Sequence, residues 1–308
     1  MEEISVIGVK DRFCFSKMKK KIHAIYKKSF KIFIGTNIGR YGIVRKLCRF
    51  LSYNLKPDWV EIEGEKMYLD EVDALCLSIN GIHEKMLTNL IKKEIHSGDV
   101  VLDIGAHIGY YTLQFANLVG PTGKVYAFEP EPKNFELLKK NVQINKHDNV
   151  VLIQKIVSDK DGIVEFFISK FDSIGNKLFK SNGEHETKEY AIKIESTTLD
   201  EYFKDSKEKI DFIKMDIQGG EGKATLGMKN LLKENKNLKI IQEWWPDALK
   251  QNHANPEDHL KFLQHIGYKF YEIDGTIEKD ILPITIEQLL GKYPNSLIED
   301  INLFCKKS

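Results

Sequence analysis

The sequence predicts an α/β protein whose core is an open, doubly wound and mostly parallel β-sheet. An apolar run at residues 100–104 carries Asp103 near its end and opens into Gly105 and Gly109, as a strand buried on both faces does before a tight turn and a helix. After this turn, strand-like and helix-like segments alternate through most of the chain. With 42% hydrophobic residues, the 308-residue chain can bury one large core and a smaller addition.

The segments that follow the glycine turn are assigned from their hydrophobic periodicity. In chain order they are strand 124–128, helix 132–145, strand 150–157, strand 210–215, helix 222–233, strand 238–242 and helix 258–266. Residues 162–198 break the alternation, and we expect two antiparallel strands there, around a mobile polar loop at 180–189. The tail predicts a closing antiparallel pair, 269–273 with 301–305.

Residues 1–80 are predicted to form an extension to a main domain of residues 81–308. Lysines surround apolar residues at helical spacing over 16–31, which indicates a basic amphipathic helix. Its apolar stripe can dock on the neighbouring domain or lie on an anionic membrane, so peripheral membrane contact stays open. Residues 60–69 predict a hairpin that acts as a lid or an added edge, and 84–96 predict a helix over the cleft.

Charge and cysteine usage exclude some classes of protein. Lysine and arginine number 46 against 45 acidic residues, so no global field favours nucleic acid as a partner. The four cysteines lie far apart and form neither a Cys-x-x-Cys pair nor a disulfide framework, as in proteins of a reducing compartment. Charged residues fill the first turns, and no apolar run approaches the ~18 residues of a membrane span. We therefore expect a cytoplasmic protein.

The glycine spacing and the acid before it indicate the cofactor. A dinucleotide-binding turn has the pattern G-x-G-x-x-G, which brings backbone amides against a pyrophosphate. Here Asp103 precedes Gly105 and Gly109 at a different spacing, and a carboxylate repels a pyrophosphate. S-adenosylmethionine fits, because it offers an ammonium and a sulfonium to the acid and a carboxylate to helix-terminal amides. We expect His107 and Tyr110 of the same turn to line the cofactor as well.

Acids and hydroxyls after the next two predicted strands extend this site. Glu129 ends strand 124–128, and a carboxylate there can accept two hydrogen bonds from the ribose diol. The alternative is a helix-capping or surface glutamate before Pro130. Ser158 and Asp159 follow the predicted strand 150–157, where they either contact the adenine or form a simple turn.

Taken together, four segments resemble the FkbM family of methyltransferases: LDIGAHIGYYT (102–112), AFEP (127–130), TLD (198–200) and DFIKMDIQGGE (211–221). The resemblance covers roughly Trp59 to the end of the chain. It implies a Rossmann-like class I fold with a seven-stranded sheet, S-adenosylmethionine as cofactor and transfer of a methyl group, in most members to oxygen. It also implies that Asp103, Gly105 and Glu129 contact the cofactor, and it says little about the acceptor.

Two positions depart from the family pattern. His107 stands where the family commonly has Asn, and we interpret it as a loop-shaping residue rather than a catalytic base. Gln218 stands where the family pattern D-V-E-G-A-E has its middle acid. If that acid acts in catalysis or binds an ion, an amide cannot replace its charge or basicity, whereas the change is mild if the acid only caps a helix.

Methyl transfer from a sulfonium is an in-line displacement, and a base helps when the acceptor is a hydroxyl. Asp216 follows strand 210–215, and we expect it to be this base, assisted by Glu221 or Glu243, and to lie at the cofactor as well. Asp216 can instead order the following turn, and Glu221 can instead stabilise a helix N-terminus. The three acids could also assemble a site for Mg²⁺ or Ca²⁺, although we predict no metal.

The predicted function is therefore O-methylation of a hydroxyl on a sugar, a glycan or another small natural product. A methyltransferase acting on a macromolecule is one alternative, but the Asn/Asp-Pro-Pro-Tyr tetrad typical of nucleic-acid base methylation is absent after the fourth predicted strand. A protein that binds the cofactor without catalysis is the other alternative, and Gln218 keeps it open.

Overall fold

A computed structural model describes residues 56–169, 176–177, 189–273, 281–293 and 301–307. The chain divides into two units, Met1–His83 and Glu84–Ser308. The predicted basic helix at 16–31 lies outside the described residues, as does the polar loop at 180–189 apart from Glu189. In the part of the chain that is described, no helix combines the length and the apolar composition needed to cross a membrane.

In the first unit, strands β1 (Trp59–Ile62) and β2 (Glu65–Tyr68) pair antiparallel, which confirms the predicted hairpin. Glu63 and Gly64 form the two-residue turn, and both have positive φ, at 53° and 88°. This is the backbone of a type I′ turn, which matches the twist of the flanking strands and favours glycine at the second position. The short helix α3 (Leu77–Asn80) completes the described part of this unit.

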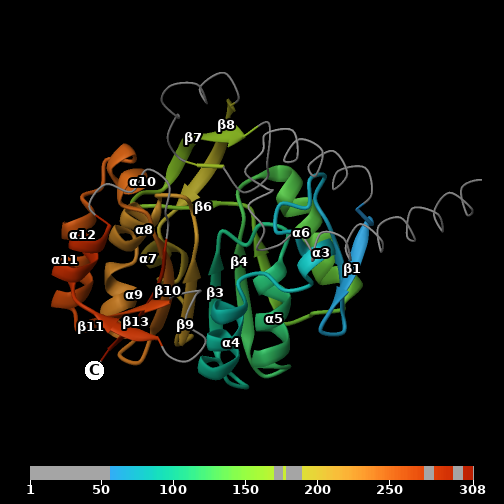
Figure 1. The fold of residues 1–308 in the computed structure, drawn as a ribbon, viewed down its shortest axis with the longest axis horizontal. Helices are drawn as coiled ribbons and strands as arrows, with labels where there is room; N and C mark the ends of the chain where they lie inside the picture. Colours follow the sequence, from blue (N-terminus) through green and yellow to red (C-terminus); the bar gives the residue numbers. More distant parts are fainter. Residues whose placement is uncertain (1–55, 170–175, 178–188, 274–280, 294–300, 308) are drawn as a thin grey trace, which may run out of the picture. The chain divides into compact units, whose positions relative to one another are not determined.

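The second unit contains a mostly parallel sheet of eight described strands in the order β12-β11-β13-β10-β9-β3-β4-β5 (Figure 1). The strands are β3 (Val100–Ile104), β4 (Lys124–Phe128), β5 (Val150–Ile153), β9 (Phe212–Met215), β10 (Lys239–Trp244), β11 (Tyr268–Ile273), β12 (Leu282–Ile284) and β13 (Ile301–Lys307). Strands β10, β9, β3, β4 and β5 pair parallel, and β13 pairs antiparallel with both β10 and β11. The predicted doubly wound fold and closing tail pair are confirmed, and β12 adds an eighth strand at the edge.

The remaining helices are α4 (Lys85–Glu94), α5 (Tyr110–Val119), α6 (Pro132–Ile144), α7 (Leu199–Tyr202), α8 (Glu221–Leu226), α9 (Lys229–Glu234), α10 (Pro246–Gln251), α11 (Pro256–His265) and α12 (Ile286–Lys292). Most of them lie where the sequence predicted helices, whereas α7, α10 and α12 were not predicted. One expected helix, 222–233, is two helices, because the chain turns at Gly227. A Cβ at Gly227 would lie 1.9 Å from the Ser158 carbonyl oxygen, so close packing on that segment requires glycine here.

The predicted single strand 150–157 is wrong. The main-sheet strand β5 ends at Ile153, and β6 (Ile156–Val157) belongs to a separate three-stranded sheet of order β6-β8-β7. The exposed Gln154 separates two apolar stretches that periodicity alone had joined. In the small sheet, β7 (Gly162–Ser169) and β8 (Glu189–Thr197) pair antiparallel, as predicted.

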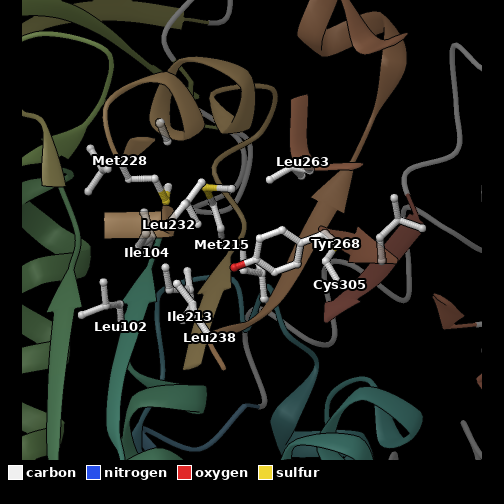
Figure 2. Packing of buried hydrophobic residues seen from close by; sticks show 14 of the residues in the cluster. Leu102, Ile104, Ile213, Met215, Met228, Leu232, Leu238, Leu263, Tyr268 and Cys305 are labelled. Carbon is white, nitrogen blue, oxygen red and sulfur yellow. The ribbon is translucent and has the colours of Figure 1, made fainter. Parts of the chain in front are cut away.

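Alternate residues of the central strands pack against helices on opposite faces of the sheet. Leu102, Ile213 and Met215 join Met228 and Leu232 of the α9 segment in the larger apolar core (Figure 2). A smaller cluster on the other face contains Leu113 of α5, Ala127 of β4, and Leu138 and Val142 of α6. Asp103 and Lys214 alternate with the residues of the larger core, so their side chains point toward the α5 face.

A buried polar pair between α11 and β10 makes folding sensitive to acid. His259 Nε2 lies 3.1 Å from Gln242 Oε1, and both residues are buried. Burial lowers the pKa of His259 from 6.5 to about 4. Because the folded form resists protonation, the neutral His259 contributes stability above pH 6.5, and this contribution is lost as the pH falls toward 4.

We expect His259→Gln, which keeps a hydrogen-bonding group without a titrating ring, to reduce this acid sensitivity. Between pH 7 and pH 4 the unfolding free energy should fall by up to about 3 kcal/mol less in the variant than in the wild type. Urea unfolding at both pH values measures the difference. Parallel pH profiles for the two proteins would contradict the assignment.

Candidate active site

The candidate site lies at the edge of the sheet where the parallel strands β3, β4, β9 and β10 have their carboxyl ends. Residues at such ends meet at one edge, which is where open α/β sheets bind ligands. In register, Asp103 of β3 pairs with Ala127 of β4 and with Lys214 of β9. The parallel pairing of β9 and β10 ends at Met215 with Gln242, so Asp216 and Glu243 follow at the same level.

The glycine turn packs against the protein itself. Gly105 has φ 84°, and a Cβ there would lie 2.0 Å from the Asp216 carbonyl oxygen. Gly109 has φ 94°, and a Cβ there would lie 2.8 Å from a methyl carbon of Leu138. The buried Asn141 of α6 donates from Nδ2 to the Ile108 carbonyl at 2.8 Å. These contacts fix the turn close to the end of β9.

Asp103 is fully buried, and it keeps an unsatisfied oxygen. The Thr112 hydroxyl donates to its Oδ2 at 2.5 Å, while Oδ1 has no hydrogen-bond partner in the described part of the chain. Burial raises the pKa of Asp103, an effect that the nearby Lys214 opposes. A buried oxygen of this kind is expected to meet a donor from a ligand or a water.

Backbone amides hold Glu129 at the end of β4. The His107 amide donates to Oε2 at 2.8 Å and the Glu131 amide to Oε1 at 2.9 Å, and the Asn134 side chain also hydrogen-bonds to this carboxylate. Burial raises the pKa of Glu129 to about 7. His107 has φ 51°, a left-handed conformation in which Asn, Asp and His are enriched. Its backbone therefore supports the loop-shaping interpretation.

Lys214 of β9 places a buried positive charge at the carboxyl-terminal edge of the sheet. Its Nζ lies 3.3 Å from Asp216 Oδ2 and 4.8 Å from the centre of the Tyr111 ring. Burial alone would lower the pKa of Lys214, but the carboxylates of Asp216, Asp103 and Glu84 together raise it. The ammonium therefore remains charged at neutral pH.

Gln218 bridges two acids: Asp216, which follows β9, and Glu243, which lies in β10. Its Nε2 donates to Glu243 Oε1 at 3.0 Å and Oε2 at 3.2 Å, and it lies 3.3 Å from Asp216 Oδ1. Gln218 has φ 53° and Gly219 has φ 91°, and a Cβ at Gly219 would lie 2.7 Å from the backbone of Ala248. This tight turn directs the amide toward both carboxylates.

Glu221 is the first residue of α8 and holds the preceding turn through its side chain. It is fully buried, and its Oε1 accepts from the Ile217 amide at 2.9 Å. Burial raises the pKa of Glu221 to about 7, with a further contribution from the charge of Asp216. Within the described ranges no three His, Cys, Asp or Glu residues form a set that could hold a metal ion. The structure therefore does not join Asp216, Glu221 and Glu243 in the cation site considered above.

Three other predicted cofactor residues have local contacts. The hydroxyl of the buried Tyr110 lies 3.4 Å from the Thr88 hydroxyl of α4. Ser158 is buried, and Asp159 is exposed. They follow β6 of the small sheet, and their hydrogen bonds run to Thr197 and to each other.

The residues at this edge fit S-adenosylmethionine. Asp103 offers an oxygen without a hydrogen-bond partner to a cation, and Glu129 offers a fixed carboxylate to a ribose hydroxyl. The sheet and the acids at its strand ends are those of a Rossmann-like class I methyltransferase fold. The family model described as the methyltransferase FkbM domain matches residues 103–270, more than half of the chain. The chain therefore belongs to the FkbM family of S-adenosylmethionine-dependent methyltransferases.

Curated relatives match shorter stretches. The 31-O-demethyl-FK506 methyltransferase FkbM of Streptomyces tacrolimicus is 43% identical over 70 residues, 23% of this chain and 26% of that protein. The "Probable cobalt-precorrin-6B C(15)-methyltransferase (decarboxylating)" of Saccharolobus solfataricus is 34% identical over 124 residues, 40% of this chain and 52% of that protein. The chain spans about half the length of such relatives, 44% and 52% for two of them. A solved structure of methyltransferase FkbM from Methylobacillus flagellatus has a TM-score of 0.41 and 17% identity, covering 68% of this chain and 43% of that one.

Lys214 and Glu84 were not assigned to the site from the sequence. A lysine inside the buried four-residue strand FIKM was an available signal, because a buried charge needs partners. Glu84 gave no such signal, since it precedes a helix whose capping it does not perform through its side chain. Its oxygens accept from the Tyr111 hydroxyl and from Asn302 Nδ2, both at 2.7 Å.

The bridge made by Gln218 leads to a prediction about stability. We expect Gln218→Leu to lower the unfolding free energy by about 1 to 2 kcal/mol, because two neighbouring carboxylates lose a shared donor. Urea unfolding at neutral pH measures the loss. The matched variant Gln218→Glu, which replaces the donor with a third acidic side chain, should lose at least as much. An unfolding free energy of Gln218→Leu equal to that of the wild type would argue against the bridge.

Proposed function

We propose that this protein transfers a methyl group from S-adenosylmethionine to a hydroxyl of a sugar, a glycan or another small natural product. One observation carries the cofactor assignment: a buried carboxylate with a vacant oxygen, Asp103, stands beside the amide-held carboxylate of Glu129 at the ends of neighbouring strands. Membership of the FkbM family supports the transfer chemistry. The printed name of the Streptomyces relative, a 31-O-demethyl-FK506 methyltransferase, supports oxygen as the acceptor atom.

In this proposal the cofactor-binding residues are those of the glycine turn and the neighbouring strand ends. They are Asp103, Gly105, His107, Gly109, Tyr110, Glu129, Ser158, Asp159 and Asp216. When bound, the cofactor supplies an electrophilic methyl group. Asp103 orients its cationic end, and Glu129 accepts hydrogen bonds from its ribose.

The acceptor-side roles follow from exposure and contacts. Asp216 is the base in this proposal, because its side chain is 32% exposed and one of its oxygens faces the Gln218 amide. Glu243 assists as the second carboxylate of the bridged pair. Glu221 acts as a positioning residue, because its carboxylate holds the Ile217 amide next to Asp216.

A second candidate function is cofactor binding without transfer. Gln218 favours it, since an amide stands where the family pattern has an acid. The discriminating experiment combines calorimetry with S-adenosylhomocysteine and a turnover assay with methyl-labelled S-adenosylmethionine across hydroxylated small molecules, glycans, RNA and protein. Binding with no labelled product would support the second candidate. A labelled macromolecule in place of a small molecule would redirect the acceptor assignment.

The Glu129 assignment predicts the pH dependence of cofactor affinity. We expect S-adenosylhomocysteine to bind about tenfold more tightly at pH 8 than at pH 6, because the carboxylate with a pKa of about 7 must ionise to accept two hydroxyl hydrogen bonds. Glu129→Ala should weaken binding at least tenfold at pH 8, and Glu129→Gln should remove the pH dependence. Calorimetric titration measures all three. Unchanged affinity in Glu129→Ala would refute the ribose contact.

The base assignment predicts a separation of binding from rate. We expect Asp216→Asn to bind S-adenosylhomocysteine with an affinity close to that of the wild type and to transfer methyl groups at least tenfold more slowly to any acceptor found in the panel. The amide retains hydrogen-bonding capacity but accepts no proton at neutral pH. Equal transfer rates would remove Asp216 from the base role.

A further inference from the structure

Asp103 and Lys214 occupy paired positions on the neighbouring parallel strands β3 and β9, so their side chains lie on the same face of the sheet. Both are buried, with 0% and 3% of their surface exposed. No ion pair within 4.0 Å joins them, although Lys214 does reach Asp216. Two opposite charges thus lie close together in the described structure without neutralising each other through direct contact.

Both groups retain unused hydrogen-bonding capacity. An ammonium has three N–H donors, and the acceptor that Lys214 Nζ meets among the described residues is Asp216 Oδ2, with the Tyr111 ring as an additional weak contact. Asp103 Oδ1 meets no donor in the same part of the chain. Buried polar atoms rarely remain unsatisfied in a folded protein. The site therefore lacks one group that accepts from an ammonium and one group that donates to a carboxylate.

A zwitterionic amino acid carries both missing groups. Its carboxylate accepts from a lysine, its ammonium donates to a carboxylate, and its net charge is zero, so it leaves the charge balance of the site unchanged. The third nearby acid, Glu84, already accepts from Tyr111 and Asn302. Asp216, which is in contact with Lys214, is 32% exposed, so one direct contact of the buried ammonium reaches solvent.

We propose that Lys214 binds the carboxylate of the amino-acid end of S-adenosylmethionine, whose ammonium the proposed function already places at Asp103. This inference rests on the proposed function, and it adds a residue that distinguishes the complete cofactor from nucleosides without an amino acid. Burial strengthens the discrimination, because a desolvated charge pair is worth more than an exposed one.

The test compares three ligands by calorimetry on the full chain: S-adenosylhomocysteine, its decarboxylated analogue, which keeps the amine, and 5′-methylthioadenosine, which lacks both charged groups. The wild type should bind S-adenosylhomocysteine at least tenfold more tightly than the decarboxylated analogue. Lys214→Met should lose at least tenfold in affinity for S-adenosylhomocysteine and should bind the other two ligands within about twofold of the wild type. Lys214→Arg should recover most of the loss, because it restores the positive charge.

Two further variants separate recognition from folding. Lys239→Met removes another strand lysine, which pairs with Glu94 at 3.0 Å, and it should leave all three affinities unchanged. Asp103→Asn should weaken S-adenosylhomocysteine and the decarboxylated analogue together, because both carry the amine. If Lys214→Met does not fold, the wild-type comparison of the first two ligands still decides the question.

Each outcome has one meaning. If the wild type binds none of the three ligands, the proposed function fails. If it binds S-adenosylhomocysteine and the decarboxylated analogue equally well, the carboxylate contact is wrong while cofactor binding stands. A parallel loss for S-adenosylhomocysteine and 5′-methylthioadenosine in Lys214→Met would assign Lys214 a structural role and overturn the inference.

Discussion

The burial of Lys214 beside three acids is the constraint on which the candidate site depends. An isolated ammonium in a protein interior is costly, and it persists only where opposite charges compensate for lost hydration. Asp216 contacts it directly, and Asp103 and Glu84 contribute through their fields. The same lysine offsets part of the repulsion among these acids. Removing Lys214 would leave Asp103, which is fully buried, without its nearby positive charge.

The glycine turn at residues 105–109 also packs against the end of β9, but through its backbone. Gly105 allows the backbone to approach the Asp216 carbonyl, and Gly109 allows it to approach Leu138. The turn is therefore shaped by the protein before any ligand arrives, and the His107 amide is committed to Glu129. Such preorganisation lowers the cost of ordering a site on binding. It also explains why the carboxylate of Glu129 stays in place despite its burial.

Hydrophobic periodicity predicted the parts of the fold where each strand or helix is a single uninterrupted pattern. Strand β4 was predicted to the residue, and β7, β8, β11 and β13 were predicted with their antiparallel pairing. Periodicity failed at residues 150–157, because two short apolar strands of different sheets are separated by only two residues, the exposed Gln154 and the half-buried Lys155. It also gave no sign of β12, whose three residues carry a proline and two partly or fully exposed apolar side chains. Which sheet a short strand joins is decided by tertiary pairing.

The site could be predicted from the sequence only where an acidic residue stands at the end of an apolar strand. The placement of Asp103, Glu129 and Asp216 at one edge could be predicted, because acids at the ends of neighbouring parallel strands lie together there. The bridge from Gln218 could not be predicted, because it depends on a left-handed turn that directs one side chain toward two others. Sequence comparison shows only that an acid is missing there, whereas the geometry shows what the amide contacts instead.

The bridge has a consequence for how a methyl group would be transferred under the proposed function. A carboxylate that accepts hydrogen bonds from an ammonium and an amide is stabilised in its charged form, and it is therefore a weaker base. Asp216 accepts from Lys214 through one oxygen and from Gln218 through the other. Asp216 is therefore not arranged to act as a strong base. In-line displacement at a sulfonium needs alignment more than basicity, so holding the acceptor oxygen close to the methyl group would supply most of the acceleration, with Asp216 taking the proton as the new bond forms.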